Sequence, residues 1–263
     1  MTALLGVNDG LAFERLNPQG QASIMLVCEY ASNRLPERLG SLGLMRDVLD
    51  GTAARAAGAA ELTERLSDLL DASAVLQRFS RLVYDCNRAH DAADVVPERC
   101  QGHIIPGNQG LDDVDRLIRR DEISEPFHGM ISACLNSVSR RSPHALLVSI
   151  RSFEAPAVPE TSPELKLGHG VDVRFASLLY DTFVRDGTYK VILDRRDSLA
   201  DAQSYTLCRH GGGRNVLTVS ISVRNDLSCS PLQRDKLARY IASVLRQALR
   251  EKSSPQVEGI VCF

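Results

Sequence analysis

Residues 144–153, with the sequence HALLVSIRSF, carry the clearest signal for the fold. From Ala145 to Ile150 every residue except Ser149 is apolar, and the run then ends in Arg151 and Ser152. A short apolar run that stops at polar residues is typical of a strand that is buried on both faces and opens onto a loop. We therefore predict a buried strand over residues 144–150, with functional residues at its carboxyl end.

Similar patterns on either side of this segment predict an alternation of strands and helices. Strands are expected at residues 22–29, 189–193 and 215–223, with a strand pair at 74–76 and 81–84. Helices are expected at residues 52–70, 115–139 (interrupted at Pro126), 172–186 and 232–251, and a long loop at 90–113. This alternation predicts an α/β fold of three layers, in which helices flank a mixed, mostly parallel sheet. No linker or repeat divides the chain, so we expect a single domain over residues 1–263.

Composition excludes several classes of partner. The chain has 31 Lys and Arg against 33 Asp and Glu, a formal charge of -2, so it lacks the basic field that nucleic acids or anionic membranes require. No basic leader and no long apolar segment is present, which predicts a cytoplasmic protein that does not bind membranes. Its seven cysteines include no C-x-x-C pair and favour a reducing compartment. Partners are expected to be small molecules or proteins, and an oligomer is possible.

Polar residues cluster where the predicted strands end. Asp85, Asn87 and Arg88 follow the segment RLVY, and Asn108 lies in the loop IIPGNQGL. Neighbouring Asn and Arg side chains can grip a carboxylate through several charge-assisted hydrogen bonds, although a surface ion pair between Asp85 and Arg88 fits the pattern equally well. Because ligands of open α/β sheets bind outside the carboxyl ends of the strands, we predict one site built from loops near residues 30, 87, 107, 151 and 224.

The six histidines show none of the spacings that place two imidazoles on one metal ion. Each is more readily explained as structural or exposed. His128, in PFHG, and His210, in YTLCRHGGG, are the better functional candidates because we expect each to lie in a polar turn.

Seven ordered segments resemble the N-formylglutamate amidohydrolase (deformylase) family. They are CEYASNRLPERLGSLGL (28–44), SRLVYDCNRAHD (80–91), IIPGNQGL (104–111), PFHGMI (126–131), SIRSF (149–153), YTLCRHG (205–211) and SVRNDL (222–227). The resemblance implies a fold similar to zinc carboxypeptidases and phosphorylase/hydrolase-like proteins, with one zinc that activates water to hydrolyse N-formyl-L-glutamate. It also implies that Asn87 and Arg88 clamp the substrate carboxylate. Asp85, Asn108, His128, His210 and Arg224 are expected to line the cleft, with His128 and His210 as catalytic candidates.

The chain departs from the family at the expected metal positions. The family motif D-H-A-S-N reads Glu29-Tyr30-Ala31-Ser32-Asn33 here, and S-I-H-S-F contains Arg151 in place of the histidine. Ser222 replaces the glutamate that would serve as general base. A guanidinium has no lone pair to give to a metal. We therefore expect no cofactor, although zinc is the cofactor of the family, and we expect Tyr30, Ser32 and Arg151 to contact an anionic ligand instead.

Two functions remain open at this stage. The chain could hydrolyse the amide of an N-formyl or N-acyl amino acid, as the resemblance implies. Alternatively, it could be a catalytically inactive member that binds an acidic metabolite or a protein partner through its carboxylate clamp. The sequence leaves open whether it is an enzyme.

Overall fold

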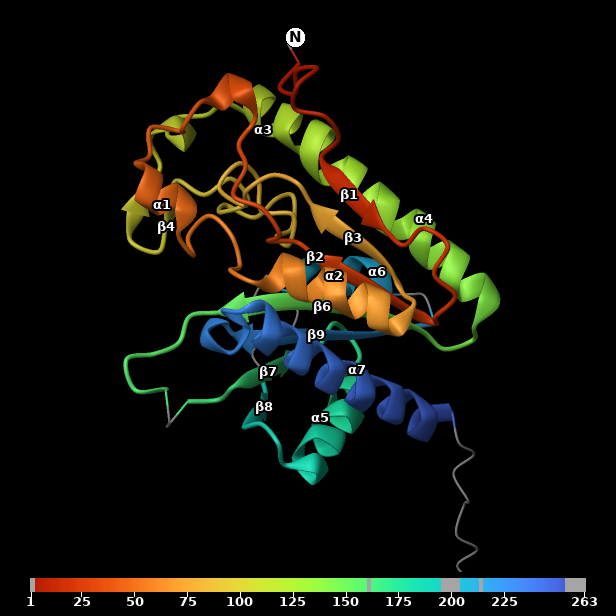
Figure 1. Ribbon diagram of the computed structural model, residues 1–263. Coiled ribbons are helices and arrows are strands. Elements are labelled where there is room, and N and C mark those ends of the chain that lie inside the picture. Colours follow the sequence, from red (N-terminus) through yellow and green to blue (C-terminus); the bar gives the residue numbers. More distant parts are fainter. Residues whose placement is uncertain (1–2, 160–161, 195–203, 213–214, 254–263) are drawn as a thin grey trace, which may run out of the picture.

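A mixed seven-stranded sheet organises the computed structural model, which describes residues 3–159, 162–194, 204–212 and 215–253 (Figure 1). The strand order is β1-β3-β2-β6-β9-β7-β8. The strands β3, β2, β6 and β9 are parallel, whereas β1 and β7 each pair antiparallel to a neighbour. Their bounds are β1 Phe13–Leu16, β2 Ile24–Cys28, β3 Ser73–Gln77, β6 Ala145–Phe153, β7 Leu165–Gly168, β8 Val191–Leu193 and β9 Val216–Arg224.

Helices cover both faces of the sheet. On one face α2, α5 and α7 pack against the apolar side chains of the central strands, and α4 covers the other face (Figure 1). The helices are α1 Arg46–Asp50, α2 Ala59–Leu70, α3 Asp113–Arg119, α4 Glu125–Arg141, α5 Arg174–Asp186, α6 Tyr205–Gly211 and α7 Pro231–Ser253. A small hairpin of β4 (Arg99–Cys100) and β5 (His103–Ile104) lies in the long loop after β3. This arrangement confirms the predicted three-layer α/β architecture.

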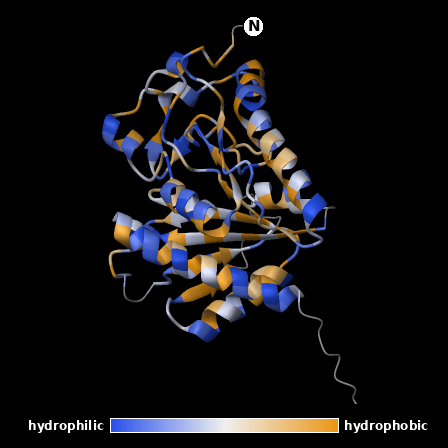
Figure 2. Ribbon diagram, turned by 45° about the vertical axis from the view of Figure 1, so that its right-hand side comes forward, coloured by the Kyte–Doolittle hydropathy of each residue, from blue (hydrophilic) through white to orange (hydrophobic). Residues whose placement is uncertain are grey.

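The two cores follow from the alternation of side chains along each strand. In β6, Leu146, Val148 and Ile150 join the core under α2 and α7, and Ala145 and Leu147 join the core under α4. Successive residues of a strand point to opposite faces, so a strand covered on both sides is mostly apolar. Figure 2 shows the hydrophobic colour concentrated in the central strands and on the inner sides of the helices.

Several predicted boundaries were wrong. Residues 81–84 form a buried turn rather than a strand, and the helix expected from residue 52 begins at Ala59. Gly58 precedes it with a φ of 75°, a conformation that favours glycine. Pro126 does not interrupt the helix. It lies in the first turn of α4, and the π-helical turn Arg120–Ser124 runs directly into that helix. The strands β1 and β7 were not predicted.

The remaining predictions on organisation are tested only in part. No helix in the described ranges combines the length and apolar character that a membrane crossing needs. The expectation of a single domain over residues 1–263 stays a prediction. Seven of the described strands, drawn from residues 13 to 224, nevertheless join in one sheet.

The core under α2 gives a direct test of the fold. Leu66 is fully buried in it, so Leu66→Ala should lower the free energy of unfolding by about 2–5 kcal/mol through lost burial and a residual cavity. The matched change Leu232→Ala, at an exposed position of α7, should alter it by less than about 0.5 kcal/mol. Urea unfolding followed by circular dichroism measures both, and equal values for the two variants would contradict this packing.

Candidate functional site

A pocket of about 260 Å³ opens at the carboxyl ends of β2, β6 and β9. It lies where the sequence predicted the site, at the edge of the sheet where parallel strands end. The residues that line it are Tyr30, Arg81, Asp85, Arg88, Arg151, Ser152, Phe153, Lys166, Gly168, Asp194 and Ser222. Among them are Tyr30, Arg88 and Arg151, three of the residues expected to bind the ligand.

Strand register places polar side chains on the floor of this pocket. Arg151 of β6 stands opposite Ser222 of β9, and Ser149 stands opposite both Val27 of β2 and Ser220 of β9. Opposed residues in neighbouring strands share one face of the sheet. The apolar side chains of this face thus give way to polar ones towards the carboxyl ends, where the pocket opens.

A buried ion pair underlies the pocket. Arg151 Nη2 lies 3.5 Å from Glu29 Oε1, and Arg151 Nε donates a hydrogen bond to Ser149 Oγ at 2.9 Å. Ser149 Oγ in turn donates to Glu29 Oε2 at 2.7 Å. Both charged side chains are almost completely buried. A carboxylate taken out of water needs a counter-charge, and Arg151 supplies it.

This donor set does not fit a zinc ion. Glu29 and Tyr30 stand at one expected ligand position, Arg151 stands at the other, and the guanidinium already pairs with the Glu29 carboxylate. Within the described part of the chain, no three His, Cys, Asp or Glu side chains are grouped so that they could hold a metal ion. A protein zinc site commonly needs three or four such ligands.

Tyr30 and Asp85 form a second polar contact in the wall of the pocket. The Tyr30 hydroxyl donates to Asp85 Oδ2 at 3.4 Å, and Arg88 Nε lies 3.8 Å from the same oxygen. Burial, followed by the charge of Asp85, raises the pKa of the Tyr30 hydroxyl far above its usual range. Burial also raises the pKa of the Asp85 carboxyl, although its hydrogen bond from the Asn87 amide and its arginine neighbours oppose that rise. Tyr30 is therefore a permanent hydrogen-bond donor.

Two cationic residues of the pocket escaped the sequence analysis. Arg81 lies over the Tyr30 ring at 4.9 Å and donates to the carbonyl oxygens of Ala53 and Thr52. It belongs to the segment that was wrongly predicted as a strand. Lys166 comes from β7. There a polar residue alternates with the apolar Leu165 and Leu167, and this pattern could have indicated the strand in the sequence.

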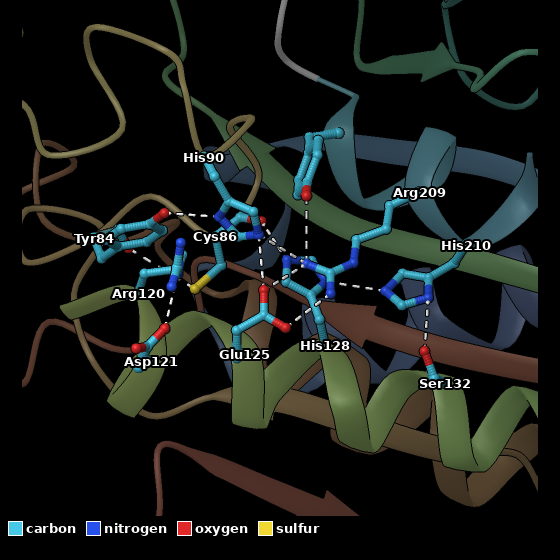
Figure 3. Close-up of polar contacts among 11 residues, drawn as sticks. Tyr84, Cys86, His90, Arg120, Asp121, Glu125, His128, Ser132, Arg209 and His210 are labelled. Carbon is cyan, nitrogen blue, oxygen red and sulfur yellow. Dashed lines mark hydrogen bonds and ion pairs between the residues drawn. The ribbon is translucent and has the colours of Figure 1, made fainter. Parts of the chain in front are cut away.

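The two candidate catalytic histidines form a buried chain of hydrogen bonds (Figure 3). His128 Nε2 lies 2.9 Å from the Cys86 carbonyl oxygen, His128 Nδ1 lies 2.9 Å from His210 Nε2, and His210 Nδ1 lies 3.4 Å from Ser132 Oγ. A carbonyl only accepts, so His128 carries its proton on Nε2 and accepts from His210 at Nδ1. The Ser132 hydroxyl then donates to His210.

This chain joins two helices instead of lining the pocket. His128 lies in α4 and His210 in α6, whereas both were expected in polar turns. Both side chains are buried, and neither is among the residues that line the pocket. Burial, reinforced by the charge of Arg209, lowers the pKa of His128 to about 3, so the ring is neutral. In this position the two rings link α6 to α4, and their catalytic role stays a prediction.

A charged cluster lies beside the histidine chain (Figure 3). Arg209 donates to both oxygens of Glu125 at 3.1 and 3.0 Å, and His90 Nε2 lies 2.8 Å from Glu125 Oε1. His90 Nδ1 also lies 2.8 Å from the Tyr84 hydroxyl. These contacts tie the turn after β3 to α4 and α6, and so hold Asp85 and Arg88 in place.

The remaining predicted residues have structural contacts. Asn87 Oδ1 accepts from the backbone N–H of Thr206, in the first turn of α6, and Asn108 Nδ2 donates to the carbonyls of Leu82 and Pro97. Arg224 forms a two-pronged pair with Asp226 at 2.7 and 3.1 Å. The Ser32 hydroxyl accepts from the Arg34 amide. None of Ser32, Asn87, Asn108 and Arg224 is among the described residues that line the pocket.

The Glu29–Arg151 pair should be visible in stability. Arg151→Met leaves the Glu29 carboxylate buried without its counter-charge, and we expect a loss of about 3–5 kcal/mol in the free energy of unfolding. The double variant Glu29→Gln/Arg151→Met removes both charges and should recover most of that loss. Urea unfolding of the four proteins in this cycle measures the coupling, and additive single effects would show that the pair is not coupled.

The buried His128 predicts a dependence of stability on pH. Its pKa in the folded protein, about 3, lies below its ordinary value of 6.5, so between these values only the unfolded chain binds the proton. Stability should therefore fall as the pH drops from 6.5 towards 3, by up to about 1.4 kcal/mol per pH unit for this proton. Urea unfolding at several pH values tests this, and His128→Gln should flatten that slope. An unchanged slope in the variant would assign the effect to other groups.

Comparison with known proteins agrees with this geometry. The model of the N-formylglutamate amidohydrolase family matches residues 22–229. A crystal structure of a gene product from Agrobacterium tumefaciens is similar with a TM-score of 0.89 and 29% identity, over 95% of this chain and 100% of that one. An N-formylglutamate amidohydrolase from Ralstonia eutropha JMP134 shares the fold with a TM-score of 0.69 and 15% identity, over 92% and 98% of the two chains. A search of curated proteins gave no match.

The family match covers most of the chain, including β2, β3, β6 and β9 and the residues around the pocket. On this evidence the chain belongs to the N-formylglutamate amidohydrolase family.

Proposed function

We propose that this protein binds a small ligand bearing a carboxylate in the pocket at the ends of β2, β6 and β9, without the zinc-dependent hydrolysis expected of its family. One observation carries the proposal. Four cationic side chains, Arg81, Arg88, Arg151 and Lys166, line the described pocket together with two acids, Asp85 and Asp194. A small concave site with this balance favours anions.

Arg88 is the residue best placed to hold the carboxylate. Its guanidinium is partly exposed in the pocket and is oriented by Asp85 at 3.8 Å and by Asp94 at 3.1 Å. A guanidinium can donate two parallel hydrogen bonds to one carboxylate. Asn87, the expected second half of the clamp, is fully buried and is not among the described residues that line the pocket. The proposed clamp therefore consists of the Arg88 guanidinium, beside the Tyr30 hydroxyl, which donates to Asp85.

The size of the pocket limits the ligand. A volume of about 260 Å³ lies just below the range of about 300–1,000 Å³ that is usual for drug-sized ligands. A small acidic metabolite suits it, and the family suggests an N-formyl or N-acyl amino acid. We expect this binding to take place in the cytoplasm, without nucleic acid or membrane; a protein partner and self-association stay open.

Amide hydrolysis is the second candidate, and one feature of the pocket favours it. Asp85 combines access to the pocket with a pKa raised by burial, which brings its carboxyl closer to the range useful for general acid–base chemistry. Family membership points in the same direction. This candidate would require catalysis by the residues present at the pocket.

Isothermal titration calorimetry with N-formyl-L-glutamate and L-glutamate tests the binding proposal. Arg88→Ala should weaken binding about 10- to 150-fold, the equivalent of losing one hydrogen-bonded charge contact of about 1.5–3 kcal/mol. The control Arg46→Ala, at an exposed arginine of α1, should bind as the unaltered protein does. Equal affinities of the Arg88→Ala variant and the unaltered protein would reject the clamp.

A formate-release assay, run with and without added zinc, separates the two candidates. Release that depends on Asp85, measured with Asp85→Asn, would favour the hydrolase. Binding without release under either condition is the result expected from the proposal.

A further inference from the structure

Lys166 and Arg151 flank Ser222 in one row across three neighbouring strands. Ser222 of β9 is opposite Arg151 of β6 on one side and opposite Lys166 of β7 on the other. Directly opposed residues place their side chains on the same face of a sheet. All three residues line the pocket.

The ammonium group of Lys166 contacts an aromatic ring from the strand beyond β9. Its Nζ lies 4.1 Å from the centre of the Phe153 ring, yet Phe153 belongs to β6, which is separated from β7 by β9. Neighbouring strands are about 4.8 Å apart, so the two side chains have to meet over β9 to make this contact. The ring thus holds the ammonium above the strand that carries Ser222, through a cation–π contact.

The row offers more donors than one carboxylate needs. A carboxylate has two oxygens in one plane, and a single guanidinium fork can satisfy both of them. Here a guanidinium edge, a hydroxyl and an ammonium come from three strands, and this combination suits an anion with more oxygens and a higher charge. Lysine binds phosphate as a point charge, and arginine binds it through its planar fork.

The acids near the row leave it attractive to an anion. Glu29 lies beneath Arg151 and is paired with it, and Asp85 contacts Tyr30 and Arg88 on the opposite wall. Asp194 is the other acid that lines the pocket. Because Glu29 offsets the charge of Arg151, the ammonium of Lys166, held against the Phe153 ring, supplies the net positive charge of the row.

We infer that Arg151, Ser222 and Lys166 form a subsite for a phosphoryl group. The ligand class is then a small metabolite that carries a phosphate at this row and a carboxylate at Arg88. The carboxylate at Arg88 rests on the proposed function, whereas the phosphoryl subsite is argued only from Arg151, Ser222 and Lys166. Inorganic phosphate and a phosphate ester present the same chemistry to the row, so the test uses both.

Calorimetry with inorganic phosphate and with O-phospho-L-serine, at constant ionic strength, tests the subsite. Lys166→Gln should weaken the binding of both probes about 10- to 150-fold, as expected for losing a charged contact. Ser222→Ala should weaken it about 2- to 12-fold, as expected for losing a neutral hydrogen bond. The control Lys236→Gln changes an exposed lysine of α7 and should have no effect. Thermal unfolding of each variant checks that it folds.

The probes also separate this inference from the proposed function. Arg88→Ala should weaken O-phospho-L-serine but leave inorganic phosphate unchanged; if neither is affected, the carboxylate clamp fails while the subsite stands. Binding of N-formyl-L-glutamate without binding of either phosphate probe would overturn the subsite and leave the clamp intact. Succinate that binds more tightly than phosphate, and that loses affinity in Lys166→Gln, would overturn it too, because the row would then hold a carboxylate.

Discussion

Burial of the central strands on both faces is the constraint on which the site depends. The strands β2, β6 and β9 lie between α2, α5 and α7 on one side and α4 and α6 on the other, so their side chains must be apolar or satisfied by neighbours. Only at the carboxyl ends, where the loops leave the sheet, can side chains be polar without such neighbours. Polar groups therefore concentrate in one place, and residues from distant parts of the chain form one pocket.

The buried charge at this edge explains why Arg151 cannot be regarded as a free ligand-binding arm. Glu29 is fully buried, and Arg151 and Ser149 provide its described polar contacts. Isolated ionised carboxylates are too costly to bury, so the guanidinium has a structural role before any ligand arrives. The same contact fixes its position on the pocket floor. A group held this rigidly loses little conformational freedom on binding, which favours affinity for an anion.

The sequence predicted the parts of the fold in which one local rule dominates. The doubly buried strands β2 and β6 contain long apolar runs and were recognised, as was β9, in which apolar residues alternate with Thr and Ser. In contrast, β1 is half-exposed and too short to give a clear pattern. Residues 82–84 are apolar for a different reason. Their carbonyls are satisfied by distant side chains, such as Asn108 on Leu82 and Arg119 on Val83, so the segment is buried without a strand partner. An apolar run alone does not distinguish these two situations.

The site was predictable to the extent that its residues follow parallel strands. Tyr30 and Arg151 met this condition, and both line the pocket; Arg88 lines it too, although the segment before it is a turn rather than the expected strand. Histidine chemistry suggested His128 and His210, but a sequence does not show that two imidazoles satisfy each other and a carbonyl inside the protein. Lys166 reaches the pocket from β7, which runs antiparallel to β9, so its position depends on a reversal of direction that the Pro-rich segment before it does not reveal. The topology of the sheet therefore brings the charge of Lys166 into the pocket, and the order of the motifs along the chain could not predict this.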